Sequence, residues 1–195
     1  MKNKIFIIFL AICGLFPIFT ISQYFLRDST AKPIPVLGQV SSFALYDAQG
    51  SPFGLKDLRG KIWIADFFFT ACSDICPMMS KHMAALNRSF NLVKDIDLVS
   101  FSVNPEYDSP KVLSDYAQKY NADTKKWHFL TGSREALTQI AAQSFKLGDM
   151  KEPIFHSSYF CLVDRQGRIR GYYDGMKKEG INQLFKDAAI LLKHD

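Results

Sequence analysis

The sequence predicts an α/β fold, an open sheet with helices on both faces, preceded by one N-terminal transmembrane helix. Three observations lead to this prediction. Residues 5–26 contain no charged side chain. Residues 61–69 (KIWIADFFF) are apolar on both faces, as in a central strand that helices cover. After that run, apolar side chains recur at steps of four and three residues over 79–93, which indicates a helix.

The N-terminal apolar run is long enough to span a bilayer. Its 22 residues would reach ~33 Å as a helix, and the hydrocarbon core is ~30 Å thick. Lys2 and Lys4 favour a cytoplasmic N-terminus, which places the body on the outer, periplasmic or extracytoplasmic face of the membrane. A cleavable signal peptide is the competing interpretation, although no small-residue cleavage site follows the run. We therefore expect a membrane anchor at 1–26, a linker at 27–38 and a folded domain at 39–195.

The composition is that of a globular protein and gives no basis for nucleic-acid binding. The chain has 195 residues, of which 48% are hydrophobic and 22% charged. Its formal charge is +5, but residues 1–32 contribute +3 of it, so the remainder carries only +2. A near-neutral body without a basic stripe lacks the electrostatic footprint of a nucleic-acid-binding protein.

Strands and helices alternate along the body. Residues 47–50 and 164–167 are turn-rich and each separates two strands, which predicts two hairpins. Pro77 and Pro110 suit the first turns of helices. The expected strands are 41–46, 52–55, 61–69, 96–103, 127–130, 158–163 and 168–173. Two of the expected helices begin at Pro77 and Ser109, and two more cover 133–145 and 179–193.

Two cysteines follow the predicted central strand. Cys72 and Cys76 lie in the sequence FTACSDICP, and functional sites of open α/β sheets lie beyond the carboxyl ends of strands. Pro77 places Cys76 at the positive end of the next helix, where unpaired N–H groups are expected to lower the thiol pKa. Within a helical turn, Cα atoms four residues apart are ~6 Å apart, which is within disulfide range. The pair can therefore form a disulfide or hold a metal ion.

Two thiolates form a soft ligand set, which suits Cu(I), zinc or an iron–sulfur cluster. A structural zinc site needs four ligands, and a four-cysteine cluster needs more cysteines than the two in this loop, so a nitrogen ligand is expected to complete the set. His194 lies at the chain end, His128 is in a predicted strand, and His82 points away from the helix N-terminus. His156 follows a loop and precedes a predicted strand, so it can lie at an end of the sheet.

Two acidic residues near the cysteines have more than one explanation. Asp66 lies in an apolar strand, so it needs a partner or a raised pKa, and it could also accept a proton from Cys76. Asp74 could tune the site or simply stabilise the helix N-terminus.

Five other residues have simple structural explanations. Met78 and Met79 could offer soft sulfur to Cu(I), but packing in the helix core is favoured. Cys161 lies in a strand among apolar neighbours, as an inert core thiol would. Glu106 and Asp108 form an acidic loop, which we interpret as a solvated turn or a docking rim.

The cysteine loop resembles that of the Sco/SenC family. The run FTACSDICPMM at 69–79 is followed, 84 residues after Cys72, by His156 in the sequence HSSYF. The resemblance extends over about residues 36–190. Further similar stretches are Ala65-Asp66, SFSVNP (100–105), 127–132 and YFCLVD (159–164).

This resemblance implies a membrane-anchored protein with a thioredoxin-like fold, in which helices flank a central mixed sheet with an N-terminal β-hairpin. It implies that Cys72, Cys76 and His156 bind copper, as Cu(I) or Cu(II), and that the two cysteines form a redox-active disulfide. The implied partners are the copper A subunit of cytochrome c oxidase and another copper carrier. Ser73 and Asn104 stand where many members have proline and aspartate, which leaves contacts around the loop open.

Three functions follow from these residues. The first is a copper-binding factor that delivers copper to, or matures, the copper A centre of cytochrome c oxidase. The second is a thiol–disulfide oxidoreductase or redox sensor that uses Cys72 and Cys76 to keep the oxidase cysteines reduced. A peroxiredoxin-like activity is disfavoured, because Thr70 lies two rather than three residues before Cys72. One cysteine pair can serve both of the first two, so whether this metallochaperone is also an enzyme stays open.

Overall fold

A mixed sheet forms the centre of the computed structural model, which describes residues 33–147 and 157–194. Within these residues eight strands pair in the order β1-β8-β7-β4-β5-β6-β2-β3. The strands β4 (Ile62–Phe68), β5 (Ile96–Ser102) and β6 (Trp127–Thr131) are parallel to one another. The strand β7 (Tyr159–Val163) is antiparallel to β4, and β8 (Arg168–Asp174) is antiparallel to β7. The predicted α/β class and central mixed sheet are confirmed.

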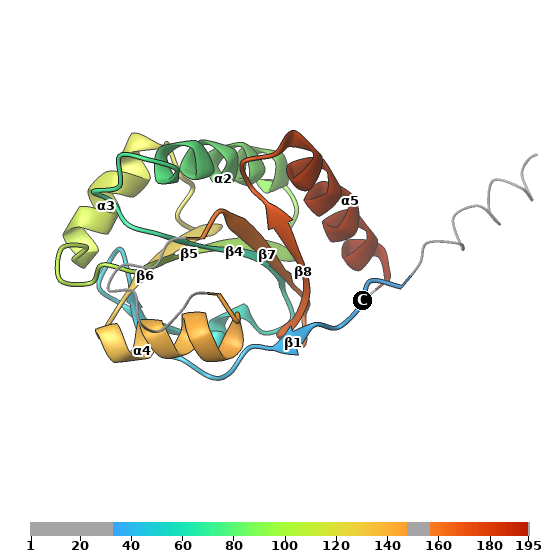
Figure 1. Ribbon diagram of the computed structural model, residues 1–195, viewed down its shortest axis with the longest axis horizontal. Helices are drawn as coiled ribbons and strands as arrows, with labels where there is room; N and C mark the ends of the chain where they lie inside the picture. Colours follow the sequence, from blue (N-terminus) through green and yellow to red (C-terminus); the bar gives the residue numbers. More distant parts are fainter. Residues whose placement is uncertain (1–32, 148–156, 195) are drawn as a thin grey trace, which may run out of the picture. The chain divides into compact units, whose positions relative to one another are not determined.

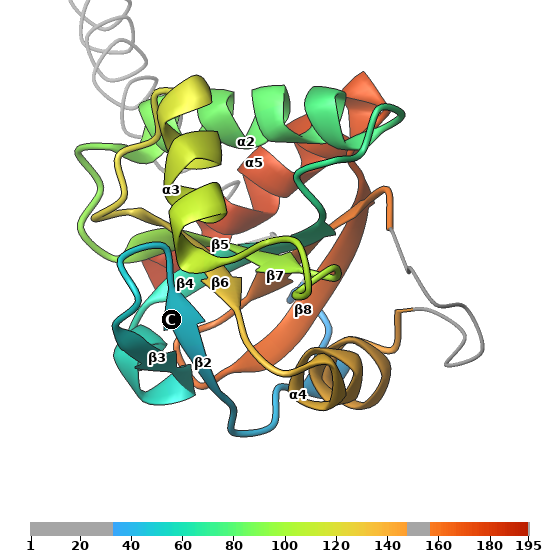
Figure 2. The same ribbon diagram turned by 90° about the vertical axis from the view of Figure 1, so that its left-hand side faces the viewer.

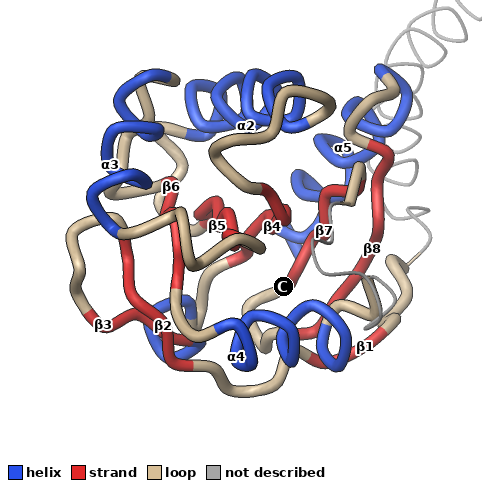
Figure 3. Tube along the Cα trace, turned by 60° about the vertical axis from the view of Figure 1, so that its left-hand side comes forward, coloured by secondary structure: helices blue, strands red, loops and turns tan. Residues whose placement is uncertain are grey.

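Short strands complete the two edges of this sheet, as Figure 3 shows. The predicted N-terminal hairpin is present as β2 (Ala44–Asp47) and β3 (Pro52–Gly54), and β2 pairs with β6. At the other edge β1 (Gly38–Gln39) pairs with β8. The backbone N–H of Leu37 also donates to the carbonyl of Ile169, at 2.8 Å. Part of the segment that we expected to be a linker is therefore held against the sheet.

Helices cover both faces of the sheet (Figures 1 and 2). One face carries α2 (Cys76–Phe90), α3 (Pro110–Lys119) and α5 (Lys178–His194). The opposite face carries α4 (Arg134–Gln139), which continues into the wide π-helical turn η2 (Ile140–Ser144). A single 3₁₀ turn, η1 (Leu55–Leu58), follows the hairpin. The helix predicted at 133–145 thus widens at its end, where Phe145 enters the core.

Capping residues in the sequence set where the helices begin. The hydroxyl of Ser109 accepts a hydrogen bond from the backbone N–H of Val112, and Ser133 does the same for Ala136, at 3.4 Å and 3.2 Å. Pro77 lies in the first turn of α2, where the missing N–H costs nothing. These caps explain why the predicted helix starts agree with the observed ones to within about a residue or two.

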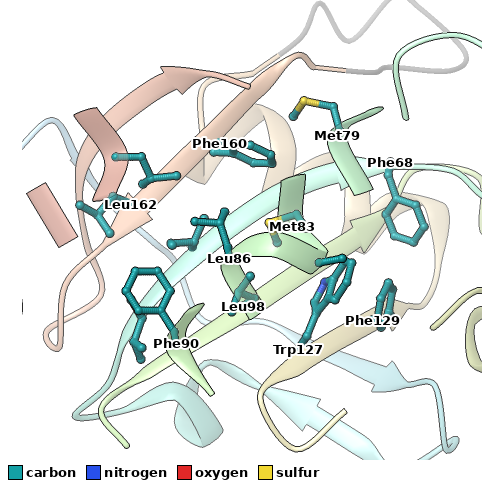
Figure 4. Close-up of a cluster of buried hydrophobic side chains, with 14 of the residues drawn as sticks. Phe68, Met79, Met83, Leu86, Phe90, Leu98, Trp127, Phe129, Phe160 and Leu162 are labelled. Atoms are coloured by element: carbon teal, nitrogen blue, oxygen red, sulfur yellow. The ribbon is translucent and has the colours of Figure 1, made fainter. Parts of the chain in front are cut away.

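The core beneath α2 consists of side chains that the sequence patterns predicted to be buried. Every residue of β4 is buried, as expected of a central strand. The apolar stripe of α2 faces the sheet, with Met79, Met83, Leu86 and Phe90 all buried. Figure 4 shows these four beside side chains from the strands, namely Phe68, Leu98, Trp127, Phe129, Phe160 and Leu162. This packing fixes the first turn of α2 over the carboxyl end of β4.

The predicted membrane anchor at 1–26 lies outside the described residues. In the part of the chain that the structure does describe, no helix is both long and apolar enough to cross a bilayer.

Candidate metal and redox site

The cysteine loop connects the carboxyl end of β4 to the first residue of α2. Cys76 begins the helix and is buried, with 2% of its surface exposed, whereas Cys72 is half-buried. The backbone N–H of Cys72 donates to the carbonyl of Phe69, at 3.2 Å, and this bond turns the loop. The predicted position of both cysteines, beyond the carboxyl end of a central strand, is confirmed.

The environment of Cys76 favours the protonated thiol. Its pKa is raised, chiefly because burial removes the thiolate from water. A hydrogen bond with the thiol of Cys72 raises it further, and a hydrogen bond from the backbone of Phe69 acts in the opposite direction. The prediction of a lowered pKa for Cys76 is therefore wrong, because burial and the neighbouring Cys72 raise it. Cys72 packs against the cluster that contains Cys76 and acts on its thiol, so the two side chains are neighbours.

A buried carboxyl group lies near Cys76 on the same face of the sheet. Burial raises the pKa of Asp66 to about 7, and the charge of Asp66 in turn contributes to the raised pKa of Cys76. The hydroxyl of Ser100 donates to Oδ1 of Asp66 at 2.5 Å, and Nε1 of Trp127 donates to the Ser100 hydroxyl at 2.8 Å. Asp66 thus has both the partner and the raised pKa that the sequence predicted. Its role as a proton acceptor for Cys76 stays a prediction.

Asp108 fastens the start of the cysteine loop to the end of β5. Its side chain is fully buried and accepts three hydrogen bonds: from the Thr70 N–H at 3.1 Å, the Thr70 hydroxyl at 2.5 Å and the Ser102 hydroxyl at 2.7 Å. The interpretation of Asp108 as a solvated turn residue is therefore wrong. Glu106 is exposed and pairs with Arg134, as a solvated turn residue should. Hydroxyl groups at the ends of two adjacent strands were the signal in the sequence that could have identified Asp108.

The predicted nitrogen ligand, His156, lies outside the described residues. Among those that are described, no three His, Cys, Asp or Glu side chains gather in a way that could hold a metal ion. His128 is a packed residue, as predicted, with Nε2 lying 3.2 Å from Oδ2 of Asp97. His82 lies on α2, and its Nδ1 is 2.8 Å from the carbonyl oxygen of Gly175. The described residues thus supply the two thiols of the predicted ligand set.

The remaining sulfur-bearing residues differ in exposure. Cys161 is fully buried, and burial raises its pKa, as expected of an inert core thiol. Met79 is buried as predicted, but Met78 is 43% exposed, so the prediction of core packing is wrong for Met78. Neighbouring positions on a helix point about 100° apart, so only one of the two methionines can face the core. Asp74 is exposed within the loop.

Comparisons with known proteins identify the family to which this fold is similar. The family model described as SCO1/SenC matches residues 36–189. A Bacillus subtilis protein named "SCO1 protein homolog" is 34% identical over 160 residues, which cover 78% of this chain and 82% of the relative.

Two solved structures are also similar. BsSco, described as a member of the Sco family of cytochrome c oxidase assembly proteins with a disulfide switch, is 33% identical with a TM-score of 0.73. That match covers 83% of this chain and 98% of BsSco. Arabidopsis thaliana ScoI, solved with copper bound, is 26% identical with a TM-score of 0.66, over 82% of this chain and 99% of ScoI. The thioredoxin-like fold that the resemblance implied is thereby confirmed, and the chain belongs to the SCO1/SenC family.

Proposed function

We propose that this chain binds copper through Cys72, Cys76 and His156 and delivers it to, or matures, the copper A centre of cytochrome c oxidase. The observation that carries the proposal is the hydrogen-bonded pair of thiols at the carboxyl end of β4. Copper in the Arabidopsis relative and the oxidase-assembly role of BsSco support it. Residues 1–26 anchor the protein in the membrane, with the folded domain on its outer face.

The chemistry of the described donors fits copper. Two adjacent sulfur atoms are soft ligands, which suit Cu(I) better than they suit a hard cation. Cys76 must lose its proton before it can coordinate a metal, so copper binding is coupled to proton release. Asp66, whose pKa is about 7, is a nearby group that can pass this proton on to solvent at neutral pH. Copper then leaves by ligand exchange, as thiolates of the acceptor replace those of Cys72 and Cys76.

The topology of the sheet supports His156 as the third ligand. The strand β7 is antiparallel to β4, so the amino end of β7 and the carboxyl end of β4 lie at the same end of the sheet. His156 precedes Tyr159, the first residue of β7, by three positions. A histidine that close to the start of β7 can reach the end of the sheet that carries the cysteine loop.

A thiol–disulfide exchange activity is the second candidate, and the unequal exposure of the two cysteines favours it. Half-buried Cys72 is the accessible sulfur that can attack a partner disulfide, and buried Cys76 then resolves the mixed disulfide. The two thiols lose two electrons and two protons as their disulfide forms, and the partner disulfide becomes two thiols. The disulfide switch described for BsSco supports this chemistry. A peroxiredoxin-like activity has no comparable support, because the Thr70 hydroxyl is bound to Asp108.

A copper titration of the reduced full chain, in detergent and without oxygen, tests the proposal. We expect one equivalent of Cu(II) to produce strong thiolate charge-transfer bands, which His156→Ala shifts or weakens and Cys72→Ser/Cys76→Ser abolishes. His128→Gln and Cys161→Ala are the matched controls and should titrate as the wild type does. Copper binding that is indifferent to His156, with full activity on a dithiol target in the absence of copper, would instead favour the exchange activity.

A further inference from the structure

A second group of soft donor atoms lies on the flank of α2 that contacts the turn between β8 and α5. Met78 and His82 are four residues apart on α2, so their side chains share one face of the helix. Met176 lies in the turn that follows β8, directly after Gly175. Figure 2 shows the start of α5 beside α2, and the His82–Gly175 contact joins the two segments.

The hydrogen bond of His82 fixes the tautomer of its ring so that Nε2 can bind a metal ion. Nδ1 lies 2.8 Å from the carbonyl oxygen of Gly175, and a carbonyl oxygen can only accept, so Nδ1 carries the proton. The lone pair of the neutral imidazole is therefore on Nε2. An Nδ1–H bond to a backbone carbonyl is the arrangement that orients metal-binding histidines and selects their tautomer.

The two thioethers on this flank are accessible from solvent. Met78 and Met176 are each 43% exposed. A thioether sulfur is a soft, uncharged ligand that selects Cu(I) over harder cations. The helix geometry that buries Met79 thus leaves the sulfur of Met78 accessible to a soft cation.

Glycine at position 175 lets the turn close against α2. A Cβ atom there would lie 2.5 Å from Sδ of Met79 and 2.8 Å from a ring carbon of Phe160, so no other residue fits without displacement. Figure 4 shows that Met79 and Phe160 belong to the packed core. The Gly175 N–H also donates to the carbonyl of Ser158, at 2.7 Å. The carbonyl that orients His82 is thus held on a rigid support.

We propose that Met78, His82 and Met176 form a second metal site, two thioethers and one imidazole, for a soft monovalent cation, which in the proposed function is Cu(I). All three donors are neutral, and the nearby carboxylate of Asp174, which accepts from the Met176 N–H, is paired with Lys177, so the donor set itself does not favour divalent cations. His82 lies six residues from Cys76 on α2, which is ~9 Å along the helix axis. An ion at this site is therefore close enough to pass to the thiols, although neither thiol is one of its ligands.

Nuclear magnetic resonance of the methionine methyl groups tests this site directly. The full chain is prepared in detergent as Cys13→Ser/Cys72→Ser/Cys76→Ser/His156→Ala, labelled with ¹³C at the methionine methyls, and titrated with Ag(I), a closed-shell soft cation. We expect one equivalent to shift the methyls of Met78 and Met176 and the ring signals of His82, while the methyl of buried Met83 stays in place. Because this variant lacks the proposed thiol and His156 ligands, the outcome is independent of the proposed function.

Matched substitutions distinguish a three-donor site from loose binding to single thioethers. His82→Gln keeps a donor for the Gly175 carbonyl but loses the imidazole, and Met78→Leu and Met176→Leu keep the bulk but lose sulfur. We expect each to weaken Ag(I) and Cu(I) binding by ~10-fold or more, and Met83→Leu to leave it unchanged. The proposal is overturned if the methyls of Met78 and Met176 do not shift, or if they shift with the same affinity in His82→Gln.

Discussion

Carboxylates are buried at both ends of the sheet, but their partners differ: charged side chains at one end and uncharged hydrogen-bond donors at the other. At the end away from the cysteines, cations hold the buried acids. Lys61 lies 2.5 Å and Lys126 3.7 Å from Asp97, while Arg168 and Arg170 lie 2.7 Å and 2.8 Å from Asp164. Burial raises the pKa of both carboxyls, but hydrogen bonds from His128 and Lys61 to Asp97, and from Arg170 and Arg168 to Asp164, outweigh it, so both pKa values are lowered overall.

At the cysteine end, the buried acids have only uncharged donors. Asp66 accepts from the hydroxyl of Ser100, and Asp108 accepts from Thr70 and Ser102. No ion pair in the described part of the chain reaches either carboxylate. Burial of Asp66 is left largely uncompensated, and its pKa rises to about 7.

This difference indicates that one end of the sheet has a structural role and that the other end can accept a cation. At the end away from the cysteines, ion pairs with lysine and arginine side chains already neutralise the buried carboxylates. Among the described residues, none of the groups that chiefly set the pKa of Cys76 is a cation, so an arriving copper ion meets no fixed positive charge from them. Burial, the neighbouring thiol of Cys72 and the charge of Asp66 raise the pKa of Cys76, so the metal itself must supply the charge that stabilises the thiolate.

The largest effect on stability is expected at the far end. Asp164→Asn leaves the buried guanidinium of Arg170 without its carboxylate, which should lower the free energy of unfolding by ~3–5 kcal/mol. Denaturant unfolding measures this change. The matched control is Glu106→Gln, which removes a carboxylate from an exposed pair with Arg134 and should leave stability nearly unchanged. Equal losses in both variants would contradict the contrast between buried and exposed pairs.

The next effect is a pH dependence at the cysteine end. Folded Asp66 keeps its proton up to about pH 7, whereas an unfolded aspartate loses it near pH ~3.9. The folded state therefore binds more protons between these values, and the free energy of unfolding falls as pH rises, by about 1.4 kcal/mol per unit. Asp66→Asn, which still accepts from Ser100, should flatten this slope and stabilise the protein at pH 8.

Unfolding curves of the wild type and of Asp66→Asn, recorded between pH 4 and pH 8, measure both slopes. Equal slopes in the two proteins would show that Asp66 is already ionised in the fold.

A smaller loss is expected where the cysteine loop is fastened. Asp108→Asn places an amide N–H₂ against the donors of Thr70 and Ser102, so one buried group loses its partner at a cost of ~1–3 kcal/mol. The loop should also loosen, which changes the reduction potential of the Cys72–Cys76 pair. Thr70→Val removes only the hydroxyl donor and should have the weaker effect on both quantities. A reduction potential unchanged in Asp108→Asn would mean that this carboxylate does not position the loop.

Much of the fold could be predicted from the sequence, because local patterns specify it. The fully apolar run at 61–69, the helical stripe that starts at Met79 and the serine caps at Ser109 and Ser133 each act over a few residues. The order of strands in the sheet and the pairing of β1 with β8 depend on contacts between residues distant in the chain. Periodicity carries no information about such contacts.

The site could be located from the sequence but its electrostatics could not. The spacing of Cys72, Cys76 and Pro77 was enough to place the thiols at a strand end and a helix start. The raised pKa of Cys76 and the burial of Asp108 depend on how tightly the loop packs. An acidic residue in a loop that follows a strand is usually solvated, so only its three donors reveal that Asp108 is structural.

Proton release on copper binding tests the central claim most directly, namely that a cation replaces protons at a site without fixed positive charge. Calorimetric titration of the reduced full chain with Cu(I) at pH 7, in buffers of different ionisation enthalpy, counts the protons released. We predict that at least one proton leaves per copper ion bound, from the Cys76 thiol, and that Cys76→Ser releases one fewer. Copper binding without proton release, or with the same release in Cys76→Ser, would contradict the account.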